Sequence, residues 1–182
     1  MDFHPPDELA GEIVTLRRYR LTDRDEVKAA IAVSFDSLRE WMPWAQSPPT
    51  DSSVMTFLAP AVEQFGGDAA ANYAITLRGS GAFVGGCGLM TRIGPGALEI
   101  GYWVHADYQR RGIARESARL LTNQALLTPG VRRVEIHCDQ RNIASAGVAR
   151  TLGFRLERVA DDPLDAEGTT RRMMVWVSER PV

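Results

Sequence analysis

Hydrophobic and polar residues alternate along several stretches of the chain, and each such stretch predicts a β-strand. The clearest is 98–104, where Leu, Ile, Tyr and Val occupy the even positions and Glu, Gly and Trp the odd ones. β-branched and aromatic residues dominate it, as strands favour. Further strands are predicted at residues 12–19, 72–77, 83–93, 131–139, 154–159 and 172–177. Residues 1–10 show no such period and are expected to form an irregular tail.

Apolar residues three and four positions apart predict about four longer helices between these strands. Their expected positions are near residues 22–34, 52–64, 113–127 and 142–152. The order is strand, two helices, three strands, helix, strand, helix, two strands. We see no internal repeat and no linker, so residues 1–182 are expected to form one α/β domain around a mixed sheet.

Composition narrows the class of protein. The chain has 182 residues, is 45% hydrophobic and carries a formal net charge of −2, which argues against direct nucleic-acid binding. The N-terminus lacks the pattern of a signal peptide, and no apolar run reaches the ~18 residues of a membrane span. We therefore expect a cytoplasmic protein that binds no membrane. Cys87 and Cys138 are expected to be buried free thiols, and the three histidines and two cysteines show no metal-ligand spacing.

A basic glycine turn separates the 98–104 strand from the next helix. Its sequence, at residues 109–114, is Gln-Arg-Arg-Gly-Ile-Ala. The first turn of a helix leaves N–H groups unpaired at the positive end of the dipole, and Gly112 lets the chain approach a ligand closely. Arg110 and Arg111 add positive charge, so the turn predicts a site for a phosphate or pyrophosphate.

A second strand-to-helix junction follows in the same order. It reads Asn142-Ile143-Ala144-Ser145 and its helix ends in Leu152-Gly153-Phe154. Alone, Asn142 or Ser145 would be read as a helix cap. Together, the two junctions resemble the motif succession of the GNAT acetyltransferases, which bind acetyl-coenzyme A. The resemblance implies a mixed, mostly antiparallel sheet of about seven strands, with two splayed central parallel strands and about four flanking helices.

The same resemblance implies the residues of the coenzyme site. The pantetheine arm would enter between the splayed strands and bond the main chain of Trp103 and Val104. Asn142 would contact the pantetheine. The pyrophosphate would be held, mostly by backbone N–H groups, at Gln109, Arg110, Arg111, Gly112, Ile113 and Ala114.

A tryptophan-rich run lies before the second predicted helix, at Trp41-Met42-Pro43-Trp44-Ala45. It is similar to the RimJ/RimL-type branch of the family, which acetylates N-terminal amines of ribosomal proteins and also includes enzymes for other amines. This resemblance implies that Trp41 and Trp44 line the acceptor groove. The alternative is that they pack a helix–loop segment onto the sheet. Acceptor specificity is expected to depend also on residues 47–53 and 161–170.

Acyl transfer to an amine requires a neutral amine, and Glu99 is the candidate general base and acceptor-binding carboxylate. The alternative for Glu99 is a charge paired on the solvent face. His105 and His137 are further candidate bases, although a lone histidine at a strand end is more often a surface or capping residue. Ser145 would contact the coenzyme and protonate the departing thiolate. In other branches a tyrosine does this, and no tyrosine stands near Ser145 in the sequence.

The predicted function is transfer of an acetyl group from acetyl-coenzyme A to a primary amine, either a protein N-terminus such as that of a ribosomal protein or a small molecule. Two alternatives remain open at this point: a catalytically silent module that senses acyl-coenzyme A, and the same fold with another donor such as succinyl-coenzyme A. The sequence is compatible with a monomer or a homodimer.

Overall fold

The central feature of the fold is one mixed sheet. The computed structural model describes residues 3–66, 70–162 and 171–182, and the strands of these ranges follow the order β1-β2-β3-β4-β5-β6-β8-β7. The strands are β1 (Glu8–Ala10), β2 (Val14–Arg18), β3 (Ala70–Leu77), β4 (Phe83–Met90), β5 (Ala97–Val104), β6 (Arg133–Asp139), β7 (Arg155–Asp162) and β8 (Arg171–Ser178). The α-helices are α1 (Arg24–Trp41), α2 (Asp51–Glu63), α3 (Ile113–Leu126) and α4 (Ile143–Thr151).

The described residues form eight strands, so the expectation of about seven was one short. The extra strand is β1, within the segment expected to be an irregular tail, and it pairs antiparallel with β2 so that Leu9 lies opposite Leu16. A strand of three residues is too short to show a hydrophobic period. Its position is set by pairing with β2, a tertiary contact that a local pattern does not reveal.

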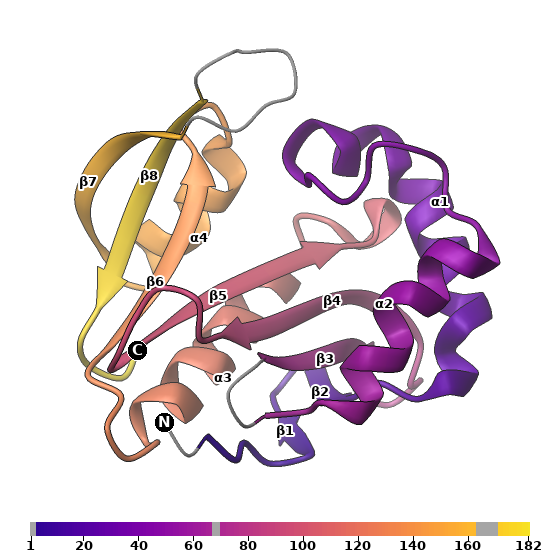
Figure 1. Ribbon diagram of the computed structural model, residues 1–182, viewed down its shortest axis with the longest axis horizontal. Helices are drawn as coiled ribbons and strands as arrows, with labels where there is room; N and C mark the ends of the chain where they lie inside the picture. Colours follow the sequence, from indigo (N-terminus) through magenta and orange to yellow (C-terminus); the bar gives the residue numbers. More distant parts are fainter. Residues whose placement is uncertain (1–2, 67–69, 163–170) are drawn as a thin grey trace.

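Helices cover both faces of the sheet (Figure 1), and a hydrophobic cluster lies under the helices of each face. On one face α1 and α2 pack against Tyr19, Ala74 and Phe83. On the other face α3 and α4 pack against a larger cluster that includes Ile100 and Ile136. The faces alternate along each strand, as the pleat requires. None of the helices in the described ranges is long and apolar enough to cross a membrane.

The sheet has one parallel pair, β5 and β6, among its described strands. Their register runs from Ala97 opposite Arg133 to Ile100 opposite Ile136 and stops there. Both strands nevertheless continue, β5 to Val104 and β6 to Asp139. Figure 1 shows the two strands diverging toward their C-terminal ends. The predicted splayed parallel pair is therefore confirmed, within a mixed α/β sheet that is otherwise antiparallel.

Candidate functional site

The opening between β5 and β6 is a local break in an otherwise paired sheet. Beyond Ile100, β5 stays paired on its outer side, with Val104 opposite Gly85 and Trp103 opposite Gly86. The end of β6 likewise stays paired with β8. Each strand is thus held from outside while the edges that face one another separate. The edge of β5 that faces β6 is unpaired beyond Ile100, so the main-chain groups that point to this edge are available to a ligand that can hydrogen-bond like an added strand.

The predicted anion turn follows β5 after a short 3-10 helix, Ala106–Tyr108, and carries an unusual backbone. Arg110 has φ +59°, and it is the one described non-glycine residue with positive φ; Gly112, the N-cap of α3, has φ +81°. Glycine adopts this region without steric cost, whereas for arginine it is uncommon. No hydrogen bond among the described residues uses the amides of residues 110–115 as donors. The turn therefore presents free N–H groups at a helix N-terminus, which suits an anionic ligand.

Side chains of the same turn hold it against the end of β5. The Gln109 side-chain amide donates to the Val104 carbonyl at 3.4 Å, and the Arg111 guanidinium donates to the Asp107 carbonyl at 2.8 Å. The Arg111 guanidinium carbon also lies 5.0 Å from the centre of the Tyr108 ring. Arg110 is exposed. The predicted pyrophosphate residues are thus brought together at one end of the open strand edge.

Ser145 lies on the other side of the opening, in the first turn of α4. Its hydroxyl lies 2.9 Å from the hydroxyl of Tyr102 on β5. No tyrosine is close to Ser145 in the sequence, but the fold places Tyr102, 43 positions away, beside it. Burial raises the pKa of Tyr102 to about 12, so this hydroxyl stays protonated at neutral pH.

Asn142 and Asp139 fix the position of α4. The Asn142 side-chain oxygen accepts a hydrogen bond from the Ser145 amide at 3.0 Å, which is the N-cap geometry. Asp139 accepts from the Arg141 amide and pairs with the Arg141 guanidinium at 2.8 Å. The hydrogen bond from Arg141 holds the pKa of Asp139 below its usual range. The loop that delivers Ser145 is therefore anchored at both ends.

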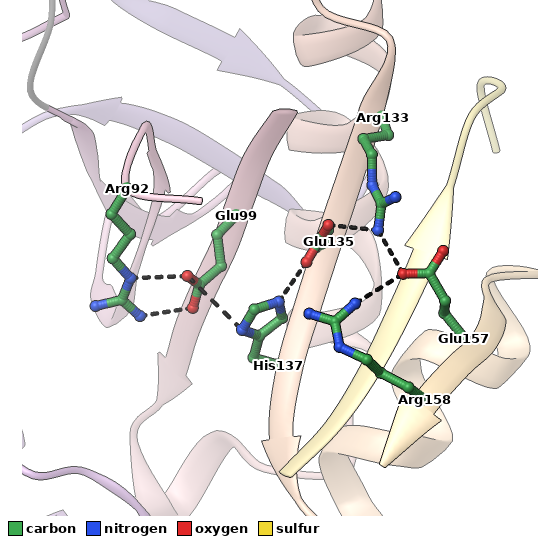
Figure 2. Close-up of polar contacts among 7 residues, drawn as sticks. All are labelled: Arg92, Glu99, Arg133, Glu135, His137, Glu157 and Arg158. Carbon is green, nitrogen blue, oxygen red and sulfur yellow. Dashed lines mark hydrogen bonds and ion pairs between the residues drawn. The ribbon is translucent and has the colours of Figure 1, made fainter. Parts of the chain in front are cut away.

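Glu99 is buried, 4% exposed, and lies on the sheet face opposite α3 and α4. Arg92, from the β4–β5 connection, donates from Nε to Glu99 Oε2 at 2.7 Å and from Nη2 to Oε1 at 2.6 Å. Glu135 lies directly opposite on β6, and His137 follows it on the same face (Figure 2). The candidate base is therefore one member of a charged network, and each of its oxygens already accepts a hydrogen bond.

Aromatic side chains border the same face near the end of β5. The Trp44 ring is 53% exposed and lies 6.2 Å from the Trp103 ring, edge to face. The Arg141 guanidinium lies 6.0 Å from the centre of the Trp41 ring. Both tryptophans of the predicted acceptor groove thus reach residues of the opening. The loop expected at 161–170 begins within β7, and its residues 163–170 lie outside the described residues.

Neither cysteine is placed for nucleophilic chemistry. Both are free thiols, 6% and 5% exposed for Cys87 and Cys138, and burial raises the pKa of each. A thiolate is the reactive form, so burial suppresses their reactivity. Across residues 3–66, 70–162 and 171–182 no cluster of three or more His, Cys, Asp or Glu side chains has the arrangement of a metal site.

Comparison with known proteins identifies the fold family. Residues 14–155 match the family model of the acetyltransferase (GNAT) domain. This chain belongs to the GNAT acetyltransferase family. Over 118 residues it is 25% identical to YnaD of Bacillus subtilis (strain 168), described as an uncharacterized N-acetyltransferase; the match covers 59% of this chain and 69% of YnaD.

Two solved GNAT structures share the fold over nearly their whole length. The microcin C7 self-immunity acetyltransferase MccE, in complex with acetyl-CoA and AMP, superimposes with a TM-score of 0.83 at 20% identity, covering 93% of this chain and 94% of MccE. RimL, a ribosomal L7/L12 alpha-N-protein acetyltransferase in complex with coenzyme A, superimposes with a TM-score of 0.80 at 20% identity, covering 94% and 96%. At these identities the likeness shows the fold.

The sequence motifs missed three partners in this GNAT site: Tyr102, Arg92 and Glu135. Strand alternation places Tyr102 on the face of Leu98, but it gives no distance to α4. Arg92 follows the strand that pairs with β5, so a hairpin register would have indicated its pairing with Glu99. Glu135 carries no local signal, because only the parallel register sets it opposite Glu99.

Proposed function

We propose that this chain is an N-acetyltransferase that moves an acetyl group from acetyl-coenzyme A to a primary amine by direct attack. The observation that carries the proposal is the end of β5–β6 pairing at Ile100 and Ile136, beside a helix N-terminus whose amides have no partner among the described residues. An extended arm fits along the open β5 edge, and its pyrophosphate fits the turn. Direct attack is favoured because neither buried cysteine suits a covalent intermediate.

The residues proposed to hold the coenzyme are those of the opening and of the turn. The unpaired edge of β5 near residues 103 and 104 suits hydrogen bonds to pantetheine, and Asn142 lies at the facing helix start. The full proposed set is Trp103, Val104, Gln109, Arg110, Arg111, Gly112, Ile113, Ala114, Asn142 and Ser145.

Ser145 is proposed to protonate the departing thiolate. Its hydroxyl is bonded to that of Tyr102, which burial keeps neutral, so two O–H groups stand together at the opening. Either hydroxyl can give its proton to sulfur while the other replaces it. Ser145→Ala is therefore expected to lower kcat about tenfold, and Ser145→Ala with Tyr102→Phe by about 100-fold or more.

We infer that the acceptor is the α-amine of a protein N-terminus, as described for RimL, with Trp41 and Trp44 lining its groove and Glu99 helping to deprotonate it. The exposed Trp44 ring beside Trp103 supports a groove open to a polypeptide. A small-molecule amine is the other acceptor class of the same chemistry. We propose that the protein is located in the cytoplasm.

The test measures thiol release from acetyl-coenzyme A with a thiol-detecting dye. The acceptors are peptides with free N-termini, the same peptides N-terminally blocked, and a set of small amines. Thiol release that needs a free amine supports the proposal, and a succinyl-coenzyme A arm tests the donor.

The competing function is an acyl-coenzyme A sensor without catalysis. It predicts coenzyme binding by calorimetry, no thiol release with any amine, and no effect of Ser145→Ala. That combination of results would exclude the enzyme proposal.

A further inference from the structure

His137 occupies the point where β5 and β6 separate. The last parallel pair joins Ile100 to Ile136, so His137 is the first residue of β6 beyond the paired segment. It lies two positions after Glu135 and therefore points to the same face of the sheet, the face of Glu99. Its side chain is 22% exposed, compared with 7% for Glu135 and 6% for Glu99. Of these three groups, the imidazole is the one most accessible from outside.

The imidazole lies between two carboxylates (Figure 2). Its Nε2 atom is 2.5 Å from Glu135 Oε2, within hydrogen-bond distance. Its Nδ1 atom is 4.0 Å from Glu99 Oε2, which is a salt-bridge distance only when the ring is protonated. The two ring nitrogens are thus not equivalent, because one has a hydrogen-bond partner and the other does not.

Each carboxylate is paired with an arginine, and these pairs indicate the tautomer of the ring. Arg92 donates two hydrogen bonds to Glu99, and Arg133 lies 2.5 Å from Glu135 Oε1. An ionised carboxylate can only accept a hydrogen bond. The hydrogen of neutral His137 must therefore be on Nε2, where it is donated to Glu135. The lone pair is left on Nδ1, on the side of Glu99.

We propose that His137 Nδ1 is the atom that takes the proton from the acceptor amine, with Glu135 as its positioning residue. The inference rests on the acetyltransferase function proposed above. One N–H bond of the acceptor ammonium breaks and one N–H bond forms on Nδ1, and the amine keeps the electron pair that attacks the thioester carbonyl. The resulting imidazolium has Glu135 on one side and Glu99 on the other. The carboxylate–imidazole arrangement follows the logic of a catalytic triad, in which the carboxylate orients the ring and stabilises its charged form.

This arrangement also gives Glu99 a different part in the reaction. Each Glu99 oxygen accepts a hydrogen bond from Arg92, so neither is the better free base in this structure. Glu99 instead stabilises the imidazolium from 4.0 Å after the proton has moved to the ring. Glu99 then assists deprotonation of the amine through its charge, without itself taking the proton.

Charged groups surround the ring on several strands. Beyond Arg133 the network continues to Glu157 on β7 at 2.7 Å, and Arg158 pairs with Glu157 at 2.9 Å. On β8 the residues opposite His137 and Glu135 are Val175 and Val177, which do not titrate. Arg155 also pairs with Glu157, at 3.6 Å. The charges nearest to the two ring nitrogens are those of Glu135 and Glu99, and both are negative.

The kinetic test uses the most active amine from the acceptor panel. His137→Asn is expected to lower kcat by at least 100-fold, leave KM for acetyl-coenzyme A within twofold, and remove the acid limb of the pH–rate profile. Glu135→Gln is expected to lower kcat at least tenfold, because the ring loses the carboxylate that orients it. His4→Asn is the matched control for the same substitution at an exposed site and is expected to keep full activity. Calorimetric coenzyme binding by each variant checks that it is folded.

The second readout needs no acceptor. The chain has three histidines, so long-range ¹H–¹⁵N correlation spectra of the labelled protein are simple, and His137→Asn assigns one set of peaks. We expect the Nε2–H tautomer for His137 in the wild type at pH 8, and loss of that preference in Glu135→Gln. If Glu135 only stabilised the fold, Glu135→Gln would leave the tautomer of His137 unchanged.

Three results would overturn the inference. The first is full kcat in His137→Asn, and the second is a Nδ1–H tautomer of His137 in the wild type. The third is loss of the acid limb of the pH–rate profile in His105→Asn or Glu99→Gln, with the profile of His137→Asn unchanged. Failure of the proposed function is distinguishable, because it would appear as a wild-type protein that acetylates no amine. Turnover by the wild type together with an active His137→Asn would refute this inference alone.

Discussion

Glu116 ties the N-terminal hairpin to the helix that carries the anion turn, and Glu116→Gln tests that connection. The side chain comes from the first turn of α3 and is 7% exposed. Its Oε1 accepts from the Glu12 amide at 2.5 Å, and its Oε2 accepts from the amides of Ile13 and Val14 at 2.9 and 3.0 Å. One carboxylate thus satisfies three backbone donors in the turn between β1 and β2.

The size of the effect follows from those three bonds. Glutamine keeps the volume but has a single oxygen, so at least one backbone N–H faces the new NH₂ group instead of an acceptor. A hydrogen bond to a charged group contributes about 1.5–3 kcal/mol and a neutral one about 0.5–1.5, and a buried donor left unpaired costs about 1–3 kcal/mol. One lost bond and two weakened ones give a loss of about 2–4 kcal/mol. That is a large part of the roughly 5–15 kcal/mol by which domains are stable.

Equilibrium unfolding in urea measures this loss as a lower midpoint with an unchanged slope. Glu12→Gln is the matched control, because it is the same substitution in an exposed side chain of the same turn, and it is expected to change stability by less than about 0.5 kcal/mol. A Glu116→Gln protein as stable as this control would refute the reasoning. We also expect Glu116→Gln to weaken acetyl-coenzyme A binding. Glu116 holds the amide of Ile13, and the side chain of Ile13 packs beside the anion turn, with its Cδ1 3.6 Å from the position of a Cβ built on Gly112.

Three further predictions concern the opening and its supports. At Gly112 there is room for a Cβ, since the nearest atom, Ile13 Cδ1, would be 3.6 Å away. The φ of +81° disfavours alanine, so Gly112→Ala should cost about 1–2 kcal/mol of stability and weaken coenzyme binding measured by calorimetry. Burial raises the pKa of Tyr102 to about 12, above the ~10 of a tyrosine in an unfolded chain. The stability of the wild type should therefore fall as pH rises from about 10 to 12, and the urea midpoint of Tyr102→Phe should fall less over that range. The pKa of Asp139 is lowered by the hydrogen bond from Arg141, so Asp139→Asn should cost about 1–2 kcal/mol of stability at pH 7. This difference should shrink as pH falls below the ~4 of an unfolded aspartate, and a difference as large at pH 2.5 as at pH 7 would contradict this origin.

Local signals in the sequence predicted most of the path of the chain. The alternation at residues 98–104 and the glycine turn after it placed β5 and the start of α3 within one residue of their observed bounds. These signals are strong because a strand period, a turn residue and a helix start all lie within about twenty positions. The splay itself came from resemblance to a family, since no local pattern states where two strands part.

Contacts between distant segments were not predictable in the same way. Tyr102 meets Ser145, and Glu99 meets Glu135, only because of the parallel register and the way α4 packs on the sheet. A shift of one residue in that register would turn Glu135 to the other face. Sequence reasoning found Glu99 as a candidate base, but not the arginine that occupies both of its oxygens. Strand β1 was missed because three residues carry no period.

The central claim is that the β5–β6 opening holds the coenzyme, and a crystal structure of the protein with acetyl-coenzyme A tests it most directly. We predict pantetheine along the main chain of Trp103 and Val104, with its pyrophosphate on the amides of residues 111–114. The thioester sulfur should lie within hydrogen-bond reach of Ser145 or Tyr102. Coenzyme bound elsewhere, or β5 and β6 paired through Val104 in the complex, would contradict the account.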